Sequence, residues 1–282
     1  ATDGSGNVST CTQEVVVTDI ELPTALCQDI TIQLNAAGTA TITAGNIDNG
    51  SDDACGIATL VASQTAFDCS HVGANTVTLT VTDNNGNVST CTSTVTVEDN
   101  VDPVAICQDL TVQLDATGNA TITGAQVDNG SNDACGIASL VVSPSTFDCA
   151  SIASNPNVVT LTVTDNNGNT ATCTAEITVE DNVDPVALCQ DLTVQLDASG
   201  DATITAAQID NGSNDACGIA SVAASQTTFD CSNVGLNVIT LTVTDNNGNT
   251  STCTSDVTVE DNVAPAAICQ DLTVQLDASG NG

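Results

Sequence analysis

The sequence lacks lysine and arginine entirely, whereas aspartate and glutamate together number 35 among 282 residues, for a formal net charge of −35. In an average globular protein roughly a tenth of the residues are basic. Nucleic-acid binding depends on cationic side chains that neutralise phosphate, so nucleic acid is excluded as a partner. Anionic membrane surfaces should repel the chain for the same reason. Lys–Asn isopeptide crosslinks are also excluded.

Aromatic residues and long apolar runs are scarce as well. The chain has three Phe, no Trp and no Tyr, and no stretch reaches the ~18 apolar residues of a membrane-spanning helix. Direct membrane insertion is therefore not expected in this stretch. Disorder is not expected either, because 41% of the residues are apolar and they alternate with polar ones. The core of each domain must be small and aliphatic.

The chain contains an internal repeat. Residues 97–109 recur almost unchanged at 179–191 and 259–271, and the spacing between equivalent cysteines is 80 or 82 residues. A fixed period of this kind indicates a tandem array, and we interpret the chain as a window on a longer one. The predicted divisions are 1–22 (C-terminal strands of a preceding repeat), 23–102 (repeat 1), 103–184 (repeat 2), 185–264 (repeat 3) and 265–282 (first strand of a following repeat).

Each repeat shows a strand pattern of period two. In repeat 2, apolar residues alternate with Thr or other polar residues over 110–114, 120–127, 137–147 (interrupted at Pro144), 159–164 and 173–179. Gly- and Asn-rich turns separate these segments, and no helical periodicity is present. The pattern predicts an all-β fold, a series of immunoglobulin-like β-sandwiches forming an extended rod.

The motifs of each repeat resemble those of the hyalin repeat (HYR) family. In repeat 2 they are Cys-x-Asp-Leu-Thr-Val at 107–112, Leu-Thr-Val-Thr-Asp-x-x-Gly-Asn at 161–169, and Cys173; Val-x-Val-x-Asp at 95–99 is the repeat 1 form of the last motif. The resemblance implies an immunoglobulin-like fold in an extracellular adhesion protein. Long acidic arrays of this kind are similar to surface adhesins of Bacteroidetes-type bacteria, which implies secretion to a bacterial cell surface.

The 14 cysteines, four in each repeat, indicate a disulfide framework made in an oxidising compartment. A structural zinc site is a weaker interpretation, because there is no Cys-x-x-Cys pair and the single histidine, His71, is expected in an exposed loop. Spacing alone permits Cys91–Cys107 across the boundary between repeats or Cys107–Cys173 within a repeat.

Strand direction favours the second scheme. In a sandwich of this topology the first and last strands run parallel as neighbours, and Cys107 and Cys173 both lie near their starts. Cys91 and Cys107 are instead separated by a strand and a linker, roughly 20 Å or more, whereas a disulfide needs Cα atoms within about 7 Å. The predicted pairs are Cys27–Cys91, Cys107–Cys173 and Cys189–Cys253, with a second set, Cys55–Cys69, Cys135–Cys149 and Cys217–Cys231, closing short loops.

Acidic and amide side chains are expected to gather where one repeat meets the next. The linker, the loop after the second strand and the turn before the last strand should lie at the same end of the sandwich. Together they form an all-oxygen cluster of the kind Ca²⁺ prefers, although Asp, Asn and Gly also simply make turns. The predicted ligands are Glu98, Asp99, Asp102, Asp128, Asp133, Asp165, Asn167 and Asn169 at one boundary, and Glu180, Asp181, Asp184, Asp210, Asp215, Asp245, Asn247 and Asn249 at the next.

No catalytic constellation is apparent, because the carboxylates lie in loops without a nearby base, a basic group or an aromatic pocket, and we expect no enzyme activity. The favoured function is a structural stalk in a secreted bacterial adhesin, stiffened by disulfides and Ca²⁺. Its partners would be the neighbouring repeats. Two alternatives are a filament or sheath built from several copies and an accessory binding module of an extracellular enzyme. The lack of Trp and Tyr argues against a carbohydrate-binding module.

Overall fold

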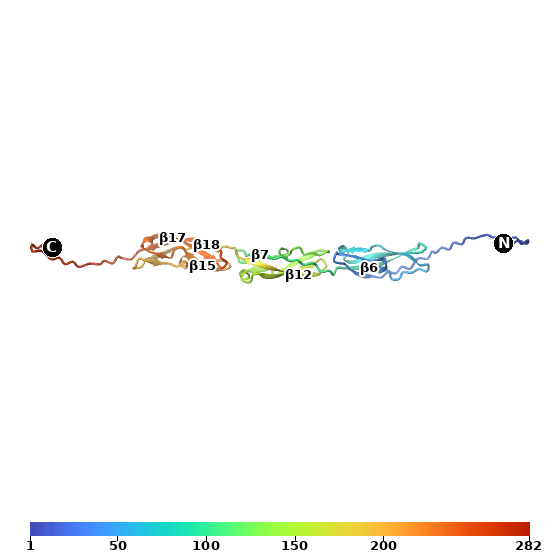
Figure 1. Ribbon diagram of the computed structural model, residues 1–282, viewed down its shortest axis with the longest axis horizontal. Helices are drawn as coiled ribbons and strands as arrows, with labels where there is room; N and C mark the ends of the chain where they lie inside the picture. Colours follow the sequence, from blue (N-terminus) through green and yellow to red (C-terminus); the bar gives the residue numbers. More distant parts are fainter. The chain divides into compact units, whose positions relative to one another are not determined.

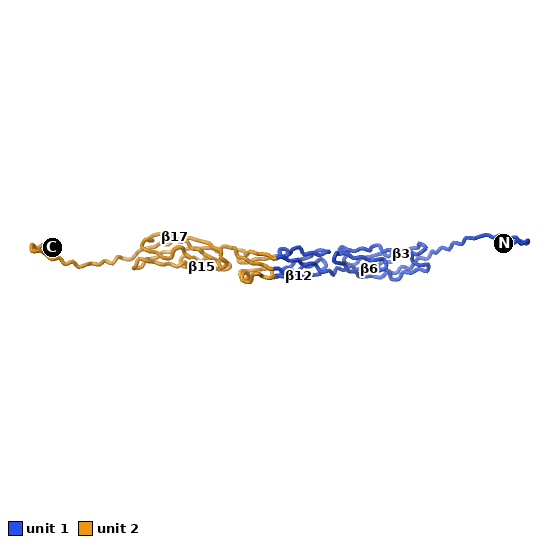
Figure 2. Tube along the Cα trace, viewed as in Figure 1, with its two compact units in different colours: residues 1–108, 123–143, 159–175 blue, residues 109–122, 144–158, 176–282 orange.

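The computed structural model describes residues 1–282 and is built almost entirely from β-strands (Figure 1). The helices are single turns of three or four residues, and none has the length and apolar character needed to cross a bilayer. The chain divides into two compact units (Figure 2): unit 1 comprises residues 1–108, 123–143 and 159–175, and unit 2 comprises 109–122, 144–158 and 176–282.

Repeat 1 lies within unit 1 and forms a two-layered sandwich. One layer is a four-stranded sheet in the order β1-β6-β5-β3, and the other is the short pair β2-β4. Strand β1 runs parallel to β6, as predicted for the first and last strands. The elements are β1 (Ile30–Gln33), β2 (Thr39–Thr41), α1 (Ala44–Ile47), β3 (Ile57–Ala62), β4 (Ala66–Asp68), η1 (Cys69–His71), β5 (Gly73–Asp83) and β6 (Val88–Glu98).

The core of repeat 1 follows from the alternation along its long strands. Every second residue of β5 from Val77 to Val81 is fully buried, while the threonines between them are partly exposed. Phe67 from the second layer and Ile47 from α1 close the core from the other side. Alternation therefore gives each strand one apolar face, and the two layers bury these faces against each other.

Repeat 2 has the same elements, and its residues fall partly in each unit. Its sheet order, β7-β12-β11-β9, corresponds to that of repeat 1. The elements are β7 (Leu110–Gln113), β8 (Asn119–Thr121), α2 (Gly124–Val127), β9 (Ile137–Ser143), β10 (Thr146–Asp148), α3 (Cys149–Ile152), β11 (Asn157–Asp165) and β12 (Thr170–Glu180).

Repeat 3 lies within unit 2 and again forms a four-stranded sheet, β13-β18-β17-β15, with the pair β14-β16. Its core is Leu196, Ile209, Phe229 and the alternating residues of the two long strands. The elements are β13 (Leu192–Gln195), β14 (Ala202–Thr203), α4 (Ala206–Ile209), β15 (Ile219–Ala224), β16 (Thr228–Phe229), η2 (Cys231–Asn233), β17 (Gly235–Asp245) and β18 (Thr250–Glu260).

The structure differs from the sequence prediction in two places. The predicted strand at 120–127 is β8 followed by the helical turn α2, because the Gln126 side chain accepts a hydrogen bond from the Thr123 main-chain N–H at 2.8 Å and so closes the first turn. Residues 1–22 and 265–282 contain no strand, only an isolated bridge between Thr2 and Val8. A strand needs a partner for its backbone groups, and these segments pair with no other strand of the chain.

Candidate functional site

Each repeat is closed by a disulfide between its first and last strands. Cys27–Cys91, Cys107–Cys173 and Cys189–Cys253 have Cα–Cα distances of 5.8, 5.9 and 5.8 Å, within the usual range. These are the three pairs that strand direction predicts, and the parallel pairing of the two strands is the reason. Cys107 lies outside the first strand itself, since it forms an isolated β-bridge with Asp128 and the strand starts at Leu110.

The second predicted set of disulfides is wrong. Cys69 pairs with Cys135 and Cys149 pairs with Cys217, so each bond joins one repeat to the next. The predicted Cys55–Cys69, Cys135–Cys149 and Cys217–Cys231 pairs do not form. Cys55 and Cys231 are exposed thiols, as are Cys11 and Cys269.

The reason is visible in repeat 1. The carbonyl of Cys55 accepts a hydrogen bond from Asn84 in the turn before β6, whereas Cys69 contacts the carbonyl of Gly38 in the turn after β1. These turns lie at opposite ends of β6, whose 11 residues span about 35 Å. Two strands, β3 and the short β4, lie between the two cysteines and carry the chain from one end to the other. The strand pattern between these cysteines was the signal available in the sequence.

The inter-repeat disulfide needs a close approach of two backbones. Gly38 has φ +71°, and a Cβ added there would lie 2.7 Å from the Cys69 Sγ and 3.0 Å from the Cβ of Ala134 in the next repeat. Gly118 repeats this geometry, with a Cβ 2.8 Å from the Cys149 Sγ and 3.1 Å from Ala216. Only glycine fits such a position, because it has no side chain and tolerates positive φ.

The turn before the last strand holds the preceding linker. The Asn169 side chain donates a hydrogen bond to the Asp99 carbonyl at 3.1 Å, and Asn249 does the same to Asp181 at 3.0 Å. Asn169 also donates to the buried carboxylate of Asp165. Burial acts to raise the pKa of Asp165, but hydrogen bonds from Asn169, Asn167 and Gly168 outweigh it and lower that pKa below its usual value.

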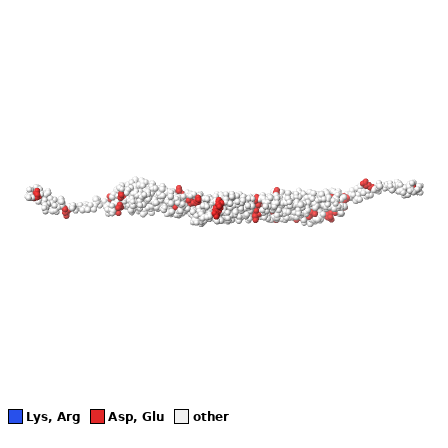
Figure 3. Space-filling view, in the orientation of Figure 1, with Lys and Arg blue, Asp and Glu red and all other residues white.

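Two carboxylates from different repeats meet beside the inter-repeat disulfide. Oxygens of Asp99 and Asp133 and the Cys135 sulfur lie within 4.8 Å of one another, and unit 2 repeats the group with Asp181, Asp215 and Cys217. Asp99 is 7% exposed and Asp181 is 6% exposed, and the Oδ2 atom of each is buried without a hydrogen-bond partner. Figure 3 shows acidic atoms gathered in separate patches with no cationic side chain on the surface drawn.

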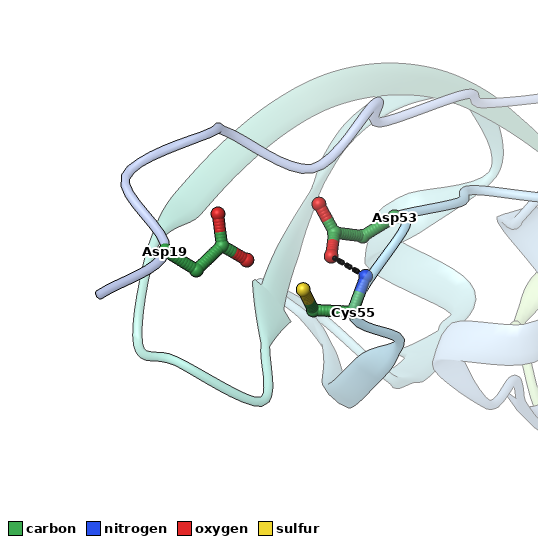
Figure 4. Close-up of side chains that lie close together, drawn as sticks. All are labelled: Asp19, Asp53 and Cys55. Carbon is green, nitrogen blue, oxygen red and sulfur yellow. Dashed lines mark hydrogen bonds between the residues drawn. The ribbon is translucent and has the colours of Figure 1, made fainter. Parts of the chain in front are cut away.

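A third group of this kind lies at the start of repeat 1. Figure 4 shows the carboxylates of Asp19 and Asp53 turned toward each other with the Cys55 thiol beside them. The Asp53 carboxylate accepts a hydrogen bond from the Cys55 main-chain N–H at 2.7 Å. The Asp19 carboxylate, through a hydrogen bond and its charge, raises the pKa of the Cys55 thiol, and Asp53 and Asp83 add to this effect.

The structure brings together only part of the predicted ligand set. Asp99 with Asp133, and Asp181 with Asp215, form close pairs. The other predicted side chains serve local structure or face solvent. Main-chain N–H groups of the local turns donate hydrogen bonds to the carboxylates of Asp128, Asp210, Asp165 and Asp245. The linker is held by Asn169 and Asn249, and the side chains of Gln33 and Gln113 donate to Glu98 and Glu180. The remaining predicted ligands are exposed: Asn167, Asn247, Asp102 and Asp184.

Comparison with known proteins supports the domain type. No family model matches the chain. It is 28% identical over 285 residues to hyalin of Strongylocentrotus purpuratus, an alignment that covers 95% of this chain and 24% of hyalin. The chain thus spans about a quarter of the length of that relative.

Solved structures with a similar arrangement include extracellular cadherin domains 1–4 of protocadherin gamma B7 (14% identity, 72% of this chain and 66% of that one, TM-score 0.31). Immunoglobulin domains 1–4 of Sidekick-1 show 8% identity, with 84% of this chain and 76% of that one covered and a TM-score of 0.30. The I67–I69 fragment of titin shows 10% identity, with 85% of this chain and 98% of that one covered and a TM-score of 0.31. At these TM-scores the likeness adds no argument of its own.

The five disulfides and the likeness to hyalin support an extracellular protein made of immunoglobulin-like repeats.

Proposed function

We propose that the chain is part of the stalk of an adhesin on a bacterial cell surface, where its repeats carry load between an adhesive region and the cell. The observation that carries this proposal is the arrangement of the disulfides. The five bonds span residues 27–91, 69–135, 107–173, 149–217 and 189–253. Each span overlaps the next, so every peptide bond from Cys27 to Cys253 is bridged by at least one disulfide.

The bonds also shorten the covalent path that bears tension. The path from Cys27 to Cys253 can cross three disulfides and needs backbone only from Cys91 to Cys107 and from 173 to 189, 16 residues each. The first stretch consists of the end of β6, which is already extended, and the linker that follows it. The chain between Cys27 and Cys253 can therefore lengthen only slightly under tension while the disulfides are intact. This property suits a stalk and is not needed by an enzyme.

Single-molecule stretching of the 282-residue chain between terminal handles tests the proposal. Reduction frees the 64, 66 and 64 residues that the three disulfides bypass and should add roughly 650 Å of contour length at about 3.4 Å per residue. Without reductant the unfolding steps of the repeats should be nearly absent. Long unfolding steps under oxidising conditions would contradict a load-bearing role.

One observation favours a second candidate function, a filament of chains joined end to end. Cys55 occupies the position that bonds in Cys135 and Cys217, and Cys231 occupies the position that bonds in Cys69 and Cys149. Cys231 also contacts the carbonyl of Gly200, as Cys69 contacts that of Gly38. The two exposed thiols are therefore complementary halves of one more inter-repeat bond, which either the neighbouring repeats of a longer array or a second copy of the chain could complete.

The filament is tested by mild oxidation of the purified chain at high concentration. If the chains join end to end, a non-reducing gel should show a ladder of disulfide-linked multimers. Peptide mapping should then identify a bond between Cys231 and Cys55. Cys231→Ser should abolish the ladder, whereas Cys11→Ser should not. Multimers that persist in Cys231→Ser, or a lack of multimers in the unsubstituted chain, would rule the filament out.

A further inference from the structure

We propose that the Asp99–Asp133 pair and the equivalent Asp181–Asp215 pair each bind one Ca²⁺ ion between neighbouring repeats. The starting observation is the unpartnered Oδ2 atom of Asp99 and of Asp181. A carboxylate oxygen that leaves water without gaining a partner costs free energy, and a second carboxylate within 4.8 Å adds like-charge repulsion. A cation held between the two carboxylates would offset both costs.

The protein supplies no such charge. The chain has no Lys and no Arg, and its N-terminal amine donates to the Ser9 carbonyl. His71, the single histidine, lies 2.8 Å from Asp68, a residue outside the pair. The cation must therefore come from solution.

The donor atoms select the ion. Asp133 uses one oxygen to accept from the Cys135 main-chain N–H at 2.7 Å, and Asp99 uses Oδ1 to accept from Val101 at 3.2 Å. Each carboxylate keeps its other oxygen for a ligand. The neighbouring Cys135 sulfur is in a disulfide, so it is no thiolate and offers nothing to Zn²⁺. Two carboxylates completed by water suit a hard cation, and extracellular Ca²⁺ sites with few charged ligands bind at about 10⁻⁴–10⁻³ M.

The same geometry occurs in both units, which supports a built site. Asp181 is buried as Asp99 is, its Oδ1 accepts from Val183 at 3.1 Å, and Asp215 accepts from Cys217 at 2.7 Å. The carboxylates of each pair come from different repeats, since Asp99 follows the last strand of repeat 1 and Asp133 precedes the third strand of repeat 2. A bound ion therefore joins the linker to the next repeat, beside the disulfide. The inference does not depend on the stalk proposal.

Calorimetric titration of the intact 282-residue chain with Ca²⁺ at pH 7 tests the proposal. Excess NaCl, fixed throughout, suppresses non-specific attraction to the net charge. The unsubstituted chain should show saturable binding, and the variant Asp99→Asn with Asp181→Asn should lose at least ten-fold in affinity for two sites. Far-UV circular dichroism of both proteins checks that the fold is retained.

The matched control is Asp102→Asn with Asp184→Asn. These exposed linker carboxylates lie close to the pairs in sequence, and their substitution removes the same charge. The control should bind Ca²⁺ as the unsubstituted chain does. Equal losses in the two double variants, unchanged binding in Asp99→Asn with Asp181→Asn, or no saturable binding by the unsubstituted chain would overturn the proposal.

Discussion

At the scale of single residues, the chain uses buried aspartates as hydrogen-bond acceptors for its own turns. Asp245 is 1% exposed and accepts from the main-chain N–H groups of Asn247 and Asn249 and from the Asn249 side chain, each at 2.8 Å. Substitution by Asn would place an amide donor against these donors. Because such bonds to a charged acceptor contribute about 1.5–3 kcal/mol, Asp245→Asn should destabilise repeat 3 by about 2 kcal/mol.

Hydrogen exchange of the β17 and β18 amides at pH 7 measures this effect, which corresponds to roughly thirty-fold faster exchange through global opening of the repeat. Asp201→Asn is the control, because Asp201 is exposed and its side chain accepts none of these bonds. Equal effects in the two variants would show that the turn does not depend on the buried carboxylate.

The same residue predicts a pH dependence. Burial acts to raise the pKa of Asp245, but hydrogen bonds from Asn249, Asn247 and Gly248 outweigh it, and the pKa is lowered in the folded state. A lowered folded pKa gives stability that is present above the unfolded pKa and is lost as pH falls through the folded pKa. The urea midpoint should therefore drop at acidic pH, and the difference from Asp245→Asn should narrow there. A constant difference down to strongly acidic pH would contradict this.

The Cys55 thiol gives a second prediction at this scale. Asp19 raises its pKa, so less thiolate is present at neutral pH, and the thiolate is the reactive form. Asp19→Asn should increase the alkylation rate of Cys55 by iodoacetamide several-fold, as measured by mass spectrometry of the Cys55 peptide. Glu21→Gln, which removes the same charge from an exposed position nearby, should have a much smaller effect; a similar acceleration there would indicate a general charge effect.

At the scale of elements, the turn between the first two strands of a repeat lies against the disulfide that joins it to the next repeat. Gly118→Ala forces a Cβ toward the Cys149 Sγ and Ala216 at a position with φ +74°. We expect a smaller fraction of Cys149–Cys217, visible by non-reducing peptide mapping after oxidative refolding, and free Cys149 thiol in its place.

Gly200→Ala is the matched control for that variant. Gly200 has the same kind of turn, with φ +84° and the Cys231 Sγ 2.8 Å from an added Cβ, but no residue of another repeat contacts it. It should show the same local strain without loss of an inter-repeat disulfide. If both variants keep Cys149–Cys217 fully formed, the close approach at Gly118 is not needed for the bond.

At the scale of the whole molecule, the inter-repeat disulfides alone bridge the linkers. Residues 91–107 are spanned only by Cys69–Cys135, and residues 173–189 only by Cys149–Cys217. A Glu-specific protease that cuts after Glu98 and Glu180 should therefore leave the three repeats in one covalent piece on a non-reducing gel. Reductant should then release single repeats.

A variant with Ser at Cys69, Cys135, Cys149 and Cys217 is the comparison for the cleavage experiment. Its repeats keep their own disulfides, so each should stay folded, but cleavage of the linkers should separate them even without reductant. Fragments that separate from the unsubstituted chain under the same conditions would contradict the pairing between repeats.

The repeat, most of the strands and one class of disulfide can be derived from the sequence alone. Alternation of apolar residues with Thr fixes which face of each strand is buried, and β5 and β6 follow it residue by residue. Parallel first and last strands bring Cys27 near Cys91, a contact that strand direction alone predicts. These features depend on local periodicity and on one rule of topology, so they can be derived without coordinates.

The contacts between one repeat and the next follow from the folded structure and not from the sequence pattern. The closest cysteine in sequence to Cys69 is Cys55, yet β3 and the short β4 carry the chain between them to the opposite end of the sandwich, and the bonded partner is Cys135, 66 residues away. The acidic residues have similar sequence surroundings, but the buried Asp99 and the half-buried Asp133 form a close pair while Asp102 faces solvent. Spacing along the chain does not encode contacts between separately folded repeats, because these depend on which ends of the two sandwiches meet.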